Sequence, residues 1–457
     1  MNSVKNNSAK VAISLVLILI GASLAVTMSS TSSYVRNADG LIIDFGDRDI
    51  TYSALDASEY PDAYSALEYA CSSEGFVLDS DGKTVTSIDG FPTASQQSSW
   101  GLYVTEKGKT VWTEVTGDPS EILLTDYSAV AWGLCSNGQT PMPAVDSTGV
   151  NFYGYGQAKR IVTLAPSVTE TVVAIGGLNA IVGTDLYSDY PRALVEAQNK
   201  GAIAIVGGYT NPSFELIVKE NPDLVVCLAS QAAHISIAEK LRARGTNVVV
   251  SNEGESIETV YENTYIIGTG MGYELGRDRV IDEMDFAFGT ISDILADDFL
   301  ITYPKVMITL STVKSPWVSG SSTYLSDILD FVYSTNIYET VNGWQQVNSE
   351  SILMYNPDYI LIVGYEGSPT QDEYQKMLDG LPAEWKRTGA FKNDRIYVFE
   401  ESAATLASHP APRVVQITEL IARILHPEAF DDGIAVPNYF GDNFKDFLTI
   451  TKEMDFS

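Results

Sequence analysis

A short unit occurs twice in this 457-residue chain, and its spacing constrains the fold more than any other feature of the sequence. The segment VGGYTNPSFELIVKENPDLVV, which begins at Val206, aligns without a gap with VNGWQQVNSESILMYNPDYIL, which begins at Val341. The offset is 135 residues throughout, and the aligned positions include an aromatic residue, a glutamate and an Asn-Pro-Asp turn. Agreement of this kind in one register indicates two lobes built to the same design.

Strands and helices alternate around both copies of the unit. In the first copy, IVTLAP, IVGTDL, LVVCLAS and NVVVS are predicted strands, and SVTETVVAIGG, FELIVKE and ISIAEKLRARG are predicted helices. This alternation is typical of a parallel sheet covered by helices. A proline-free helical stretch from Ser256 to Phe299 joins the lobes, and its GTGMGYELG segment predicts a kink or a break. The predicted boundaries are 157–255 for the N-lobe, 256–300 for the bridging helix, 303–430 for the C-lobe and 431–457 for a tail.

An apolar run near the N-terminus determines the predicted localisation. The run VAISLVLILIGASLAVTM carries no charge, and its eighteen residues are just enough to span a bilayer. The lysines before it place the short N-terminus, residues 1–9, in the cytoplasm and the rest of the chain outside. We expect residues 10–28 to be a transmembrane anchor or, alternatively, a cleaved signal peptide. The remainder is extracytoplasmic in both cases, either anchored at the cell surface or secreted.

The segment before the first lobe has a different texture. Residues 41–140 contain short alternating runs separated by Gly-rich turns, which predicts a small strand-rich α+β domain with one helix, and residues 141–156 are a predicted linker. Cys71 and Cys135 both lie in this domain and are a candidate disulfide pair, because disulfides are permitted outside the cell. Cys227 lies in the apolar run LVVCL and is expected to be buried. The predicted fold class is therefore α/β, with two lobes bridged by a long helix, preceded by this domain and a transmembrane helix.

Composition argues against several classes of function. The formal net charge of −31 repels the phosphates of nucleic acids, so no nucleic acid partner is expected. The three cysteines and three histidines are scattered and form no recognisable metal site. No Gly-x-Ser-x-Gly elbow is present. We expect a monomeric binding protein with no catalytic residues, no metal and no intrinsic cofactor.

The repeated unit places one glutamate in each lobe, at Glu215 and Glu350. Each falls in the first turn of a predicted helix, where a carboxylate interacts favourably with the helix dipole. That local role is one explanation of both residues. The alternative is that two lobes with the same glutamate on the same relative surface dock on basic sockets of a two-fold partner.

Aromatic residues follow or precede the predicted strands at comparable places in both lobes. Tyr209 and Trp344 lie in the loops before the repeated helices, and Tyr187, Tyr190 and Trp317 come just after strands. Loops at one end of an open α/β sheet line its ligand crevice. These five residues are therefore candidates for binding a large, flat, partly apolar ligand, or they simply pack on their own lobes.

Ser167 and Glu170 have the spacing of a capping box ahead of an apolar run, so we expect them to start a helix. The N–H groups of that helix start are also candidate contacts for an anionic ligand group, which makes Ser167 a candidate binding residue. His409 precedes a Pro-rich turn and is either a metal-centre ligand or a hydrogen-bonded loop histidine.

From Arg160 to about Pro427 the chain resembles the periplasmic binding proteins for cobalamin and ferric siderophores. The resemblance is carried by IVTLAPSVTETVVAIGG, TDLYSDYP, the glutamate-to-NPD unit in both lobes and PAPRVVQITELIARI, in that order. It implies two Rossmann-like lobes bridged by a rigid helix, with ligand between them, in residues 157–430. It also implies partners, the permease and ATPase subunits of an ABC importer, with Glu215 and Glu350 bridging to arginines of the permease.

The resemblance extends to the ligand. In cobalamin-binding members aromatic residues surround the corrin, and by position these match Tyr187, Tyr209, Trp317 and Trp344. A further aromatic of that cage is Leu228 here, so the cage is incomplete. Residues 41–140 resemble, through SALDASEY, SIDG and SSWGLYV, the small β domain that ends transcobalamin. The implied transported ligand is a corrinoid such as cobalamin.

Two alternatives remain at this stage. A ferric siderophore or haem receptor would place cations in the cleft, for which Arg192, Lys314 and Arg413 are the candidates. An enzyme or chelatase on the same bilobal fold would need clustered His or Cys ligands at the lobe boundary, and the sequence offers no such cluster.

Overall fold

The computed structural model describes residues 40–45, 49–53, 58–92, 98–106, 113–135, 144–152, 157–296, 303–364, 370–454 and 456. The predicted anchor, residues 10–28, and the segment before it lie outside these ranges. Within them, no helix combines the length and the apolar character needed to cross a membrane. The membrane anchor therefore stays a prediction.

The first unit is a five-stranded sheet in the order β2-β1-β7-β5-β6, and helix α2 packs against it. Its elements are β1 (Gly40–Asp44), β2 (Asp49–Ser53), α2 (Ala63–Glu74), β3 (Leu78–Ser80), β4 (Val85–Ile88), β5 (Ser99–Glu106), β6 (Thr113–Val115) and β7 (Tyr127–Cys135). Asp62 caps α2 and forms a capping box with Ser65. This unit has a hydrophobic core of its own, centred on Leu67, Ile88 and Trp132.

The candidate disulfide between Cys71 and Cys135 is not formed. Cys71, on α2, is a free thiol buried in the core of the first unit. Burial and the nearby Asp89 raise the pKa of this thiol to about 11, so it stays protonated near neutral pH. The pairing had rested only on the two cysteines sharing a domain, which does not bring two sulfur atoms into bonding distance.

The N-lobe is a five-stranded sheet in which all pairings are parallel, in the order β12-β11-β10-β15-β16. Its strands are β10 (Ile161–Thr163), β11 (Ile181–Thr184), β12 (Ala204–Ile205), β15 (Leu224–Leu228) and β16 (Asn247–Ser251), with the small hairpin β13 (Gly207–Gly208) and β14 (Asn211–Pro212). Its helices are α3 (Pro166–Ala174), α4 (Arg192–Asn199), α5 (Phe214–Lys219) and α6 (Ala232–Ala243). Every residue of β15 is buried, including Cys227, as expected for a central parallel strand covered on both faces.

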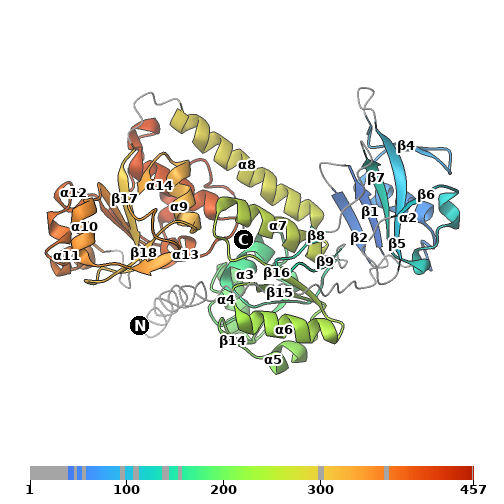
Figure 1. Ribbon diagram of the computed structural model, residues 1–457, viewed down its shortest axis with the longest axis horizontal. Coiled ribbons are helices and arrows are strands. Elements are labelled where there is room, and N and C mark those ends of the chain that lie inside the picture. Colours follow the sequence, from blue (N-terminus) through green and yellow to red (C-terminus); the bar gives the residue numbers. More distant parts are fainter. Residues whose placement is uncertain are drawn as a thin grey trace.

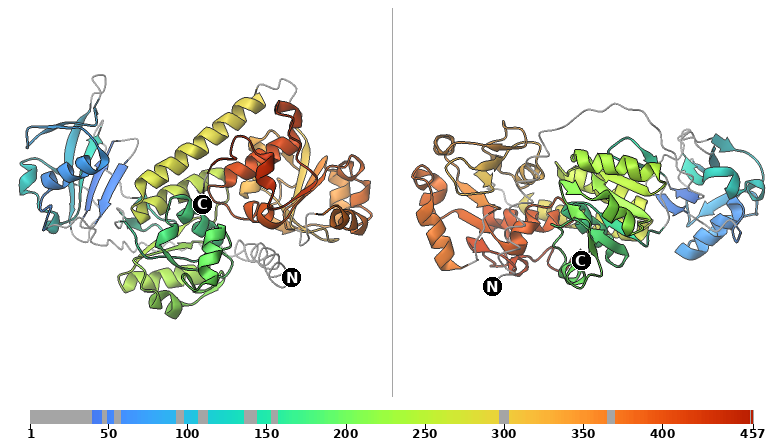
Figure 2. Two further views of the ribbon diagram at one scale, coloured as in Figure 1. Left: turned by 180° about the vertical axis from the view of Figure 1, so that it is seen from behind. Right: turned by 90° about the horizontal axis from the view of Figure 1, so that it is seen from below.

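Two helices, separated by a break, connect the lobes, which confirms the break predicted in the bridging stretch. Helix α7 (Ile257–Met271) ends at Gly272, whose φ of 66° suits a glycine cap, and α8 (Glu274–Ala296) follows. Figure 1 shows α8, in yellow, running from beside α7 in the N-lobe to the C-lobe. In both views of Figure 2 the first unit lies on the far side of the N-lobe from the C-lobe.

The C-lobe sheet is mixed, in contrast to the N-lobe sheet. Strands β17 (Lys305–Thr309), β19 (Thr335–Asn336), β21 (Tyr359–Ile362), β22 (Ile396–Phe399) and β23 (Tyr439–Phe440) pair in parallel, and β18 (Trp317–Ser319) and β20 (Trp344–Gln346) pair antiparallel at one edge. The helices are α9 (Tyr324–Phe331), α10 (Ser349–Tyr355), α11 (Gln371–Gly380), α12 (Gly389–Lys392), α13 (Glu401–Leu406) and α14 (Val414–Leu425).

The repeated unit forms the same local structure twice. Helices α5 and α10 are capped at equivalent positions by Ser213 and Asn348. The Asn-Pro-Asp turn then aims the next strand in each lobe. Asp223 accepts a hydrogen bond from the N–H of Arg160 (2.9 Å) and Asp358 from that of Lys305 (2.9 Å), so each aspartate ties the turn to the first strand of its sheet.

Two segments that the sequence suggested to be a linker and a tail are packed on the lobes. Strands β8 (Ala144–Val145) and β9 (Asn151–Phe152) form a hairpin whose Asp146 pairs with Arg242 of α6. After α14, the chain returns to add β23 to the C-lobe sheet, and Glu419 accepts hydrogen bonds from the backbone of Thr449 and Thr451. Both segments are held by long-range pairs that local sequence patterns do not reveal.

The N-lobe, the connecting helices and the C-lobe share one hydrophobic core. The cluster runs continuously from Val172 on α3 through Ile291 on α8 to Leu325 on α9 and Val414 on α14. Close-packed interiors transmit strain and resist rearrangement. The shared core therefore limits how far the lobes move relative to each other.

Candidate ligand-binding site

The predicted ligand residues lie where the strands of each lobe end or turn. Because all strands of the N-lobe sheet are parallel, the loops that follow them emerge at one edge, and the loop after β11 carries Tyr187 and Tyr190. Tyr209 lies in the turn between β13 and β14. In the C-lobe, Trp317 and Trp344 open the antiparallel strands β18 and β20.

The register of the C-lobe edge brings the two tryptophans together. Trp317 pairs with Gln346 and Ser319 with Trp344, so both indole rings extend from the same face of the β18–β20 ladder. Diagonal neighbours on one face of an antiparallel pair lie within reach of aromatic side chains. Both rings are half-buried and pack against the shared core.

Tyr209 differs from its repeat counterpart Trp344, because it is buried. Its side chain is 2% exposed and packs edge-on against His234, with ring centroids 5.6 Å apart. The hydroxyl donates to Glu253 (3.0 Å) and accepts from Gln231 (3.1 Å). In this structure the Tyr209 ring is part of a hydrogen-bonded cluster inside the N-lobe.

Two partners of Tyr209 in that cluster, His234 and Glu253, also have shifted pKa values. The Nδ1 atom of His234 accepts from the N–H of Leu228 (3.2 Å), so Nε2 carries the proton and donates to the Tyr209 carbonyl (2.8 Å). Burial lowers the pKa of His234 to about 4 and raises the pKa of Glu253 to about 7. Leu228, at the position of the missing cage aromatic, is itself buried in the shared core.

The loop after β11 is held from within the N-lobe. Asp185 accepts from the N–H of Tyr187 (2.7 Å) and from the Ser188 hydroxyl. Tyr187 is half-buried, and its ring lies within 3.7 Å of the place where a side chain at Gly208 would begin. Tyr187 therefore lies beside the β13–β14 turn that carries Tyr209.

A buried ionic cluster joins the two lobes and was not foreseen from the sequence. Glu170, on α3, is bound by Arg413 from just before α14 through two hydrogen bonds of 2.8 and 2.7 Å. His409 Nδ1 lies 2.7 Å from the same carboxylate, and the Tyr190 ring covers the Arg413 guanidinium, 3.5 Å from its centroid. Glu170, His409 and Arg413 are each at most 3% exposed.

The expected capping box at Ser167 and Glu170 is wrong. Helix α3 begins one residue earlier, at Pro166, and its cap position, Ala165, has no side chain able to cap it. Ser167 is buried inside the first turn, and Glu170 points into the lobe junction instead of back to the helix start. A carboxylate surrounded by valines and threonines in SVTETVV signals a buried partner as strongly as a cap, and that signal was available in the sequence.

The carboxylates of this junction differ in their protonation. Burial alone would raise the pKa of Glu170, but Arg413 and His409 together hold it below its usual value, so Glu170 is ionised. Burial raises the pKa of Asp185 to about 6 and also raises that of Asp189. Asp189 has no charge partner in the described chain as close as Glu170 has.

The three candidate cations are differently placed. Arg413 is committed to Glu170. Arg192 is 92% exposed and pairs with Glu196 along α4. Lys314 is exposed in the turn between β17 and β18. Neither surface cation belongs to the buried junction between the lobes.

Glu215 and Glu350 occupy matching exposed positions in the first turns of α5 and α10. Their surroundings are also alike, because each helix follows its capping residue by one position and ends at the Asn-Pro-Asp turn. The Ser213 hydroxyl donates to Glu215 at 3.2 Å. Both carboxylates remain open to a partner from outside.

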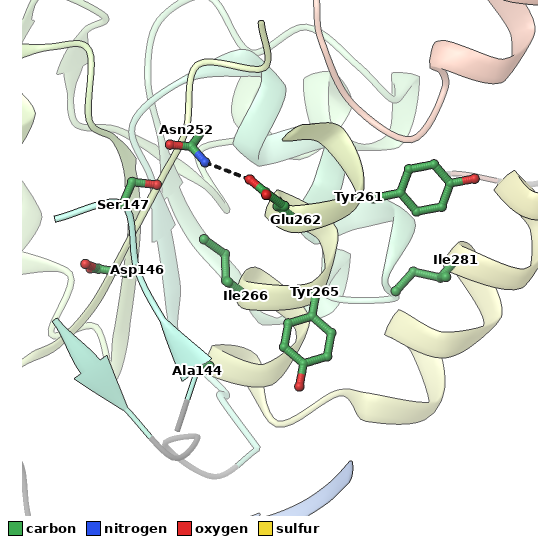
Figure 3. A pocket seen from close by; sticks show the side chains of 9 residues that line it. All are labelled: Ala144, Asp146, Ser147, Asn252, Tyr261, Glu262, Tyr265, Ile266 and Ile281. Carbon is green, nitrogen blue, oxygen red and sulfur yellow. Dashed lines mark hydrogen bonds between the residues drawn. The ribbon is translucent and has the colours of Figure 1, made fainter. Parts of the chain in front are cut away.

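A cavity of about 570 Å³ lies away from all of these residues (Figure 3). It is an open pocket beside the β8–β9 hairpin, α7 and α8, and its lining includes Ser147, Tyr261, Tyr265 and Ile281. Asn252 donates to Glu262 across one side of it. None of the predicted ligand residues lines this cavity.

Comparisons with known proteins agree with this architecture. The family model of periplasmic binding proteins matches residues 161–403. An uncharacterised ABC transporter substrate-binding lipoprotein, YvrC of Bacillus subtilis, is 25% identical over 277 residues, which cover 60% of this chain and 82% of the relative. The cobalamin-binding protein of Halobacterium salinarum is 24% identical over 292 residues, 63% of this chain and 74% of the relative.

Solved structures give the same result for the fold. A possible iron-binding, periplasmic solute-binding protein from Staphylococcus epidermidis superposes with a TM-score of 0.50 at 25% identity, over 59% of this chain and 99% of that protein. The two α/β lobes are therefore those of a known binding-protein fold. The relatives are solute-binding proteins, in agreement with the expectation that this chain is not an enzyme. On the match over residues 161–403 and the architecture described above, the chain belongs to the periplasmic binding protein family.

Proposed function

We propose that this protein is the extracytoplasmic substrate-binding component of an ABC importer, which captures a corrinoid such as cobalamin between its lobes and delivers it to the permease. The observation that carries the transport part is the pair of exposed glutamates, Glu215 and Glu350, at one position of a repeated unit. Local capping does not require both, because Ser213 and Asn348 already cap these helices. Hydrolysis of ATP belongs to other subunits.

The charge of the lobe junction supports a corrinoid over an anionic chelate. Arg413 is neutralised by Glu170, and Asp185 and Asp189 add further acid groups beside it. An anionic ferric siderophore or the carboxylates of haem would find no free buried cation at this junction. A corrinoid, whose ring periphery carries neutral amides, avoids that repulsion.

The aromatic residues support a flat, partly apolar ligand. Trp317 and Trp344 offer one paired surface on the C-lobe, and Tyr187 offers a half-buried ring beside the β13–β14 turn of the N-lobe. The shared core favours capture by lobes that close only slightly. Tyr209, being buried, contributes by supporting the turn on which it lies.

The second candidate is a ferric chelate or haem receptor. It is favoured by one relative, the Fe(3+)-citrate-binding protein YfmC of Bacillus subtilis, which is 24% identical over 243 residues. The exposed Lys314, three positions before Trp317 in the chain, is the cation that would serve it.

The N-terminal part of the proposal concerns placement. Residues 10–28 would hold the protein at the outer face of the membrane, and residues 41–140 would form a separate domain resembling the small domain of transcobalamin. The independent core of the first unit supports that division. A cell fractionation would test the anchor. The full chain should be found with the membranes, and the chain without residues 1–28 should not.

Ligand identity is tested by titrating the full chain with cyanocobalamin, haemin and ferric citrate in parallel. We expect tight binding of cyanocobalamin with a shift of its absorption spectrum. Binding of haemin or ferric citrate at micromolar concentration, with none of cyanocobalamin, would replace the corrinoid proposal by the second candidate.

A further inference from the structure

The junction between the lobes contains two polar atoms that the described chain leaves without a partner. Arg413 uses Nε and Nη2 on Glu170, and its Nη1 has no acceptor. Asp189 Oδ1 has no donor. Both atoms are buried, and an unmade buried hydrogen bond costs about 1–3 kcal/mol, more for charged groups.

The two groups belong to one electrostatic neighbourhood. Arg413 acts on the pKa of Asp189, lowering it, and Asp189 acts on that of Arg413, raising it. Asp189 lies on the loop after β11, and Arg413 precedes α14, so the two approach from the two sides of the junction. Tyr190, next to Asp189 in the chain, covers the guanidinium face.

The geometry points to a subsite for a primary carboxamide of the ligand, formed by Arg413 and Asp189. This inference rests on the proposed function, because it assigns a place to one peripheral amide of a corrinoid. An amide oxygen accepts a hydrogen bond and its NH₂ group donates two, so one amide offers both the acceptor that Nη1 lacks and the donor that Oδ1 lacks. A carboxylate has no hydrogen to donate to Asp189, and an ammonium has no lone pair to accept from Arg413.

The charge of the site also favours a neutral group. Glu170 already neutralises Arg413, so an incoming carboxylate gains little from the guanidinium. Both atoms are closed to solvent in this structure, so binding of the amide requires the loop that carries Asp189 and Tyr190 to shift. The amide then completes the two hydrogen bonds that are missing.

The inference is tested with the ligand itself. Cyanocobalamin is compared with its monocarboxylic acid derivatives, in each of which one peripheral amide is hydrolysed. The full chain is expected to bind at least one of these acids about tenfold more weakly than the parent amide, because a mismatched polar group in a hydrogen-bonding site is strongly rejected. Binding of every acid as tightly as the parent would mean that the two atoms hold only water, and would overturn the subsite.

One variant reads out the role of Asp189. In Asp189→Asn the side-chain amide donates to a carboxylate, so the tenfold discrimination should fall to about twofold or less. Glu255→Gln, a change of the same kind at an exposed residue of the loop after β16, should keep the discrimination. An unchanged ratio in Asp189→Asn overturns the subsite while the corrinoid function stands, whereas failure of the unmodified chain to bind cyanocobalamin overturns both.

Discussion

The two copies of the repeated unit agree on the outside of the molecule and differ on the inside. Glu215 and Glu350 are exposed in equivalent first turns. Tyr209 is instead buried in a hydrogen-bonded cluster, whereas Trp344 stands half-buried on an edge strand beside Trp317. The surface that would meet a two-fold symmetric partner has stayed symmetric, and the surface that would meet an asymmetric ligand has not.

The difference follows from the sheets on which the copies lie. In the five-stranded N-lobe sheet every pairing is parallel, and Tyr209 lies outside it, in the turn of the β13–β14 hairpin, whose backbone carbonyl at Tyr209 accepts a hydrogen bond from His234. In the C-lobe, β18 and β20 add an antiparallel edge, and Trp344 belongs to that edge. The same sequence position is therefore a packing residue in one lobe and a half-exposed one in the other.

The largest expected effect tests the shared outer feature. The double change Glu215→Ala and Glu350→Ala should reduce uptake at least about 100-fold, because each removed carboxylate leaves a basic group of the permease unpaired. Ligand affinity of the purified protein should be unchanged. Uptake is measured in cells that depend on this protein for the ligand, and affinity by titration.

The matched control is Glu239→Ala with Asp372→Ala, which removes one exposed carboxylate from each lobe, Asp372 also from a helical first turn. This pair should leave uptake intact. If the control abolishes uptake equally, overall charge and not the repeated position governs docking.

The next effect concerns the junction that joins the unlike inner surfaces. Glu170→Gln removes the charge that neutralises Arg413 and should lower the free energy of unfolding by about 3–5 kcal/mol, because it leaves a buried guanidinium without its partner. Glu196→Gln removes the partner of exposed Arg192 and should cost less than about 1 kcal/mol. Both values come from urea unfolding. Equal costs would mean that the junction is hydrated.

Much of the outer surface was predictable from the sequence, and little of the junction was. The caps, the Asn-Pro-Asp turns and the glutamates in first turns depend on residues a few positions apart, so a local pattern carries them. The Glu170–Arg413 pair joins residues 243 positions apart, and the capping pattern at Ser167 offered a nearer explanation. The β8–β9 hairpin and the strand β23 were not predicted for the same reason, since each is held by an ion pair or a strand pairing with a distant part of the chain.

A pair of variants separates the two copies of the aromatic position. Trp344→Ala should weaken ligand binding about tenfold, as expected when a central aromatic contact is lost, with a small effect on stability. Tyr209→Phe should instead lower the free energy of unfolding by about 1–2 kcal/mol and leave ligand affinity nearly unchanged, because it leaves Gln231 and Glu253 without a shared partner. Affinity and unfolding are measured on both. A tenfold loss of affinity in Tyr209→Phe would place that hydroxyl against the ligand.

The last expected effect is the pH dependence of the Tyr209 cluster, which the C-lobe copy lacks. Burial raises the pKa of Glu253 from 4.5 to about 7, so the neutral carboxyl stabilises the fold. That contribution is complete below pH 4.5 and is lost as the pH rises through about 7, by on the order of 3 kcal/mol. The Gln side chain in Glu253→Gln stays neutral at every pH. Between about pH 5 and about pH 8, the free energy of unfolding of the unmodified protein should therefore fall relative to that of the variant. Asp185 and Glu400 titrate in both proteins, so their contributions cancel in this difference. If the free energies of unfolding of the two proteins changed in parallel with pH, Glu253 would be hydrated and the buried cluster would not distinguish the lobes.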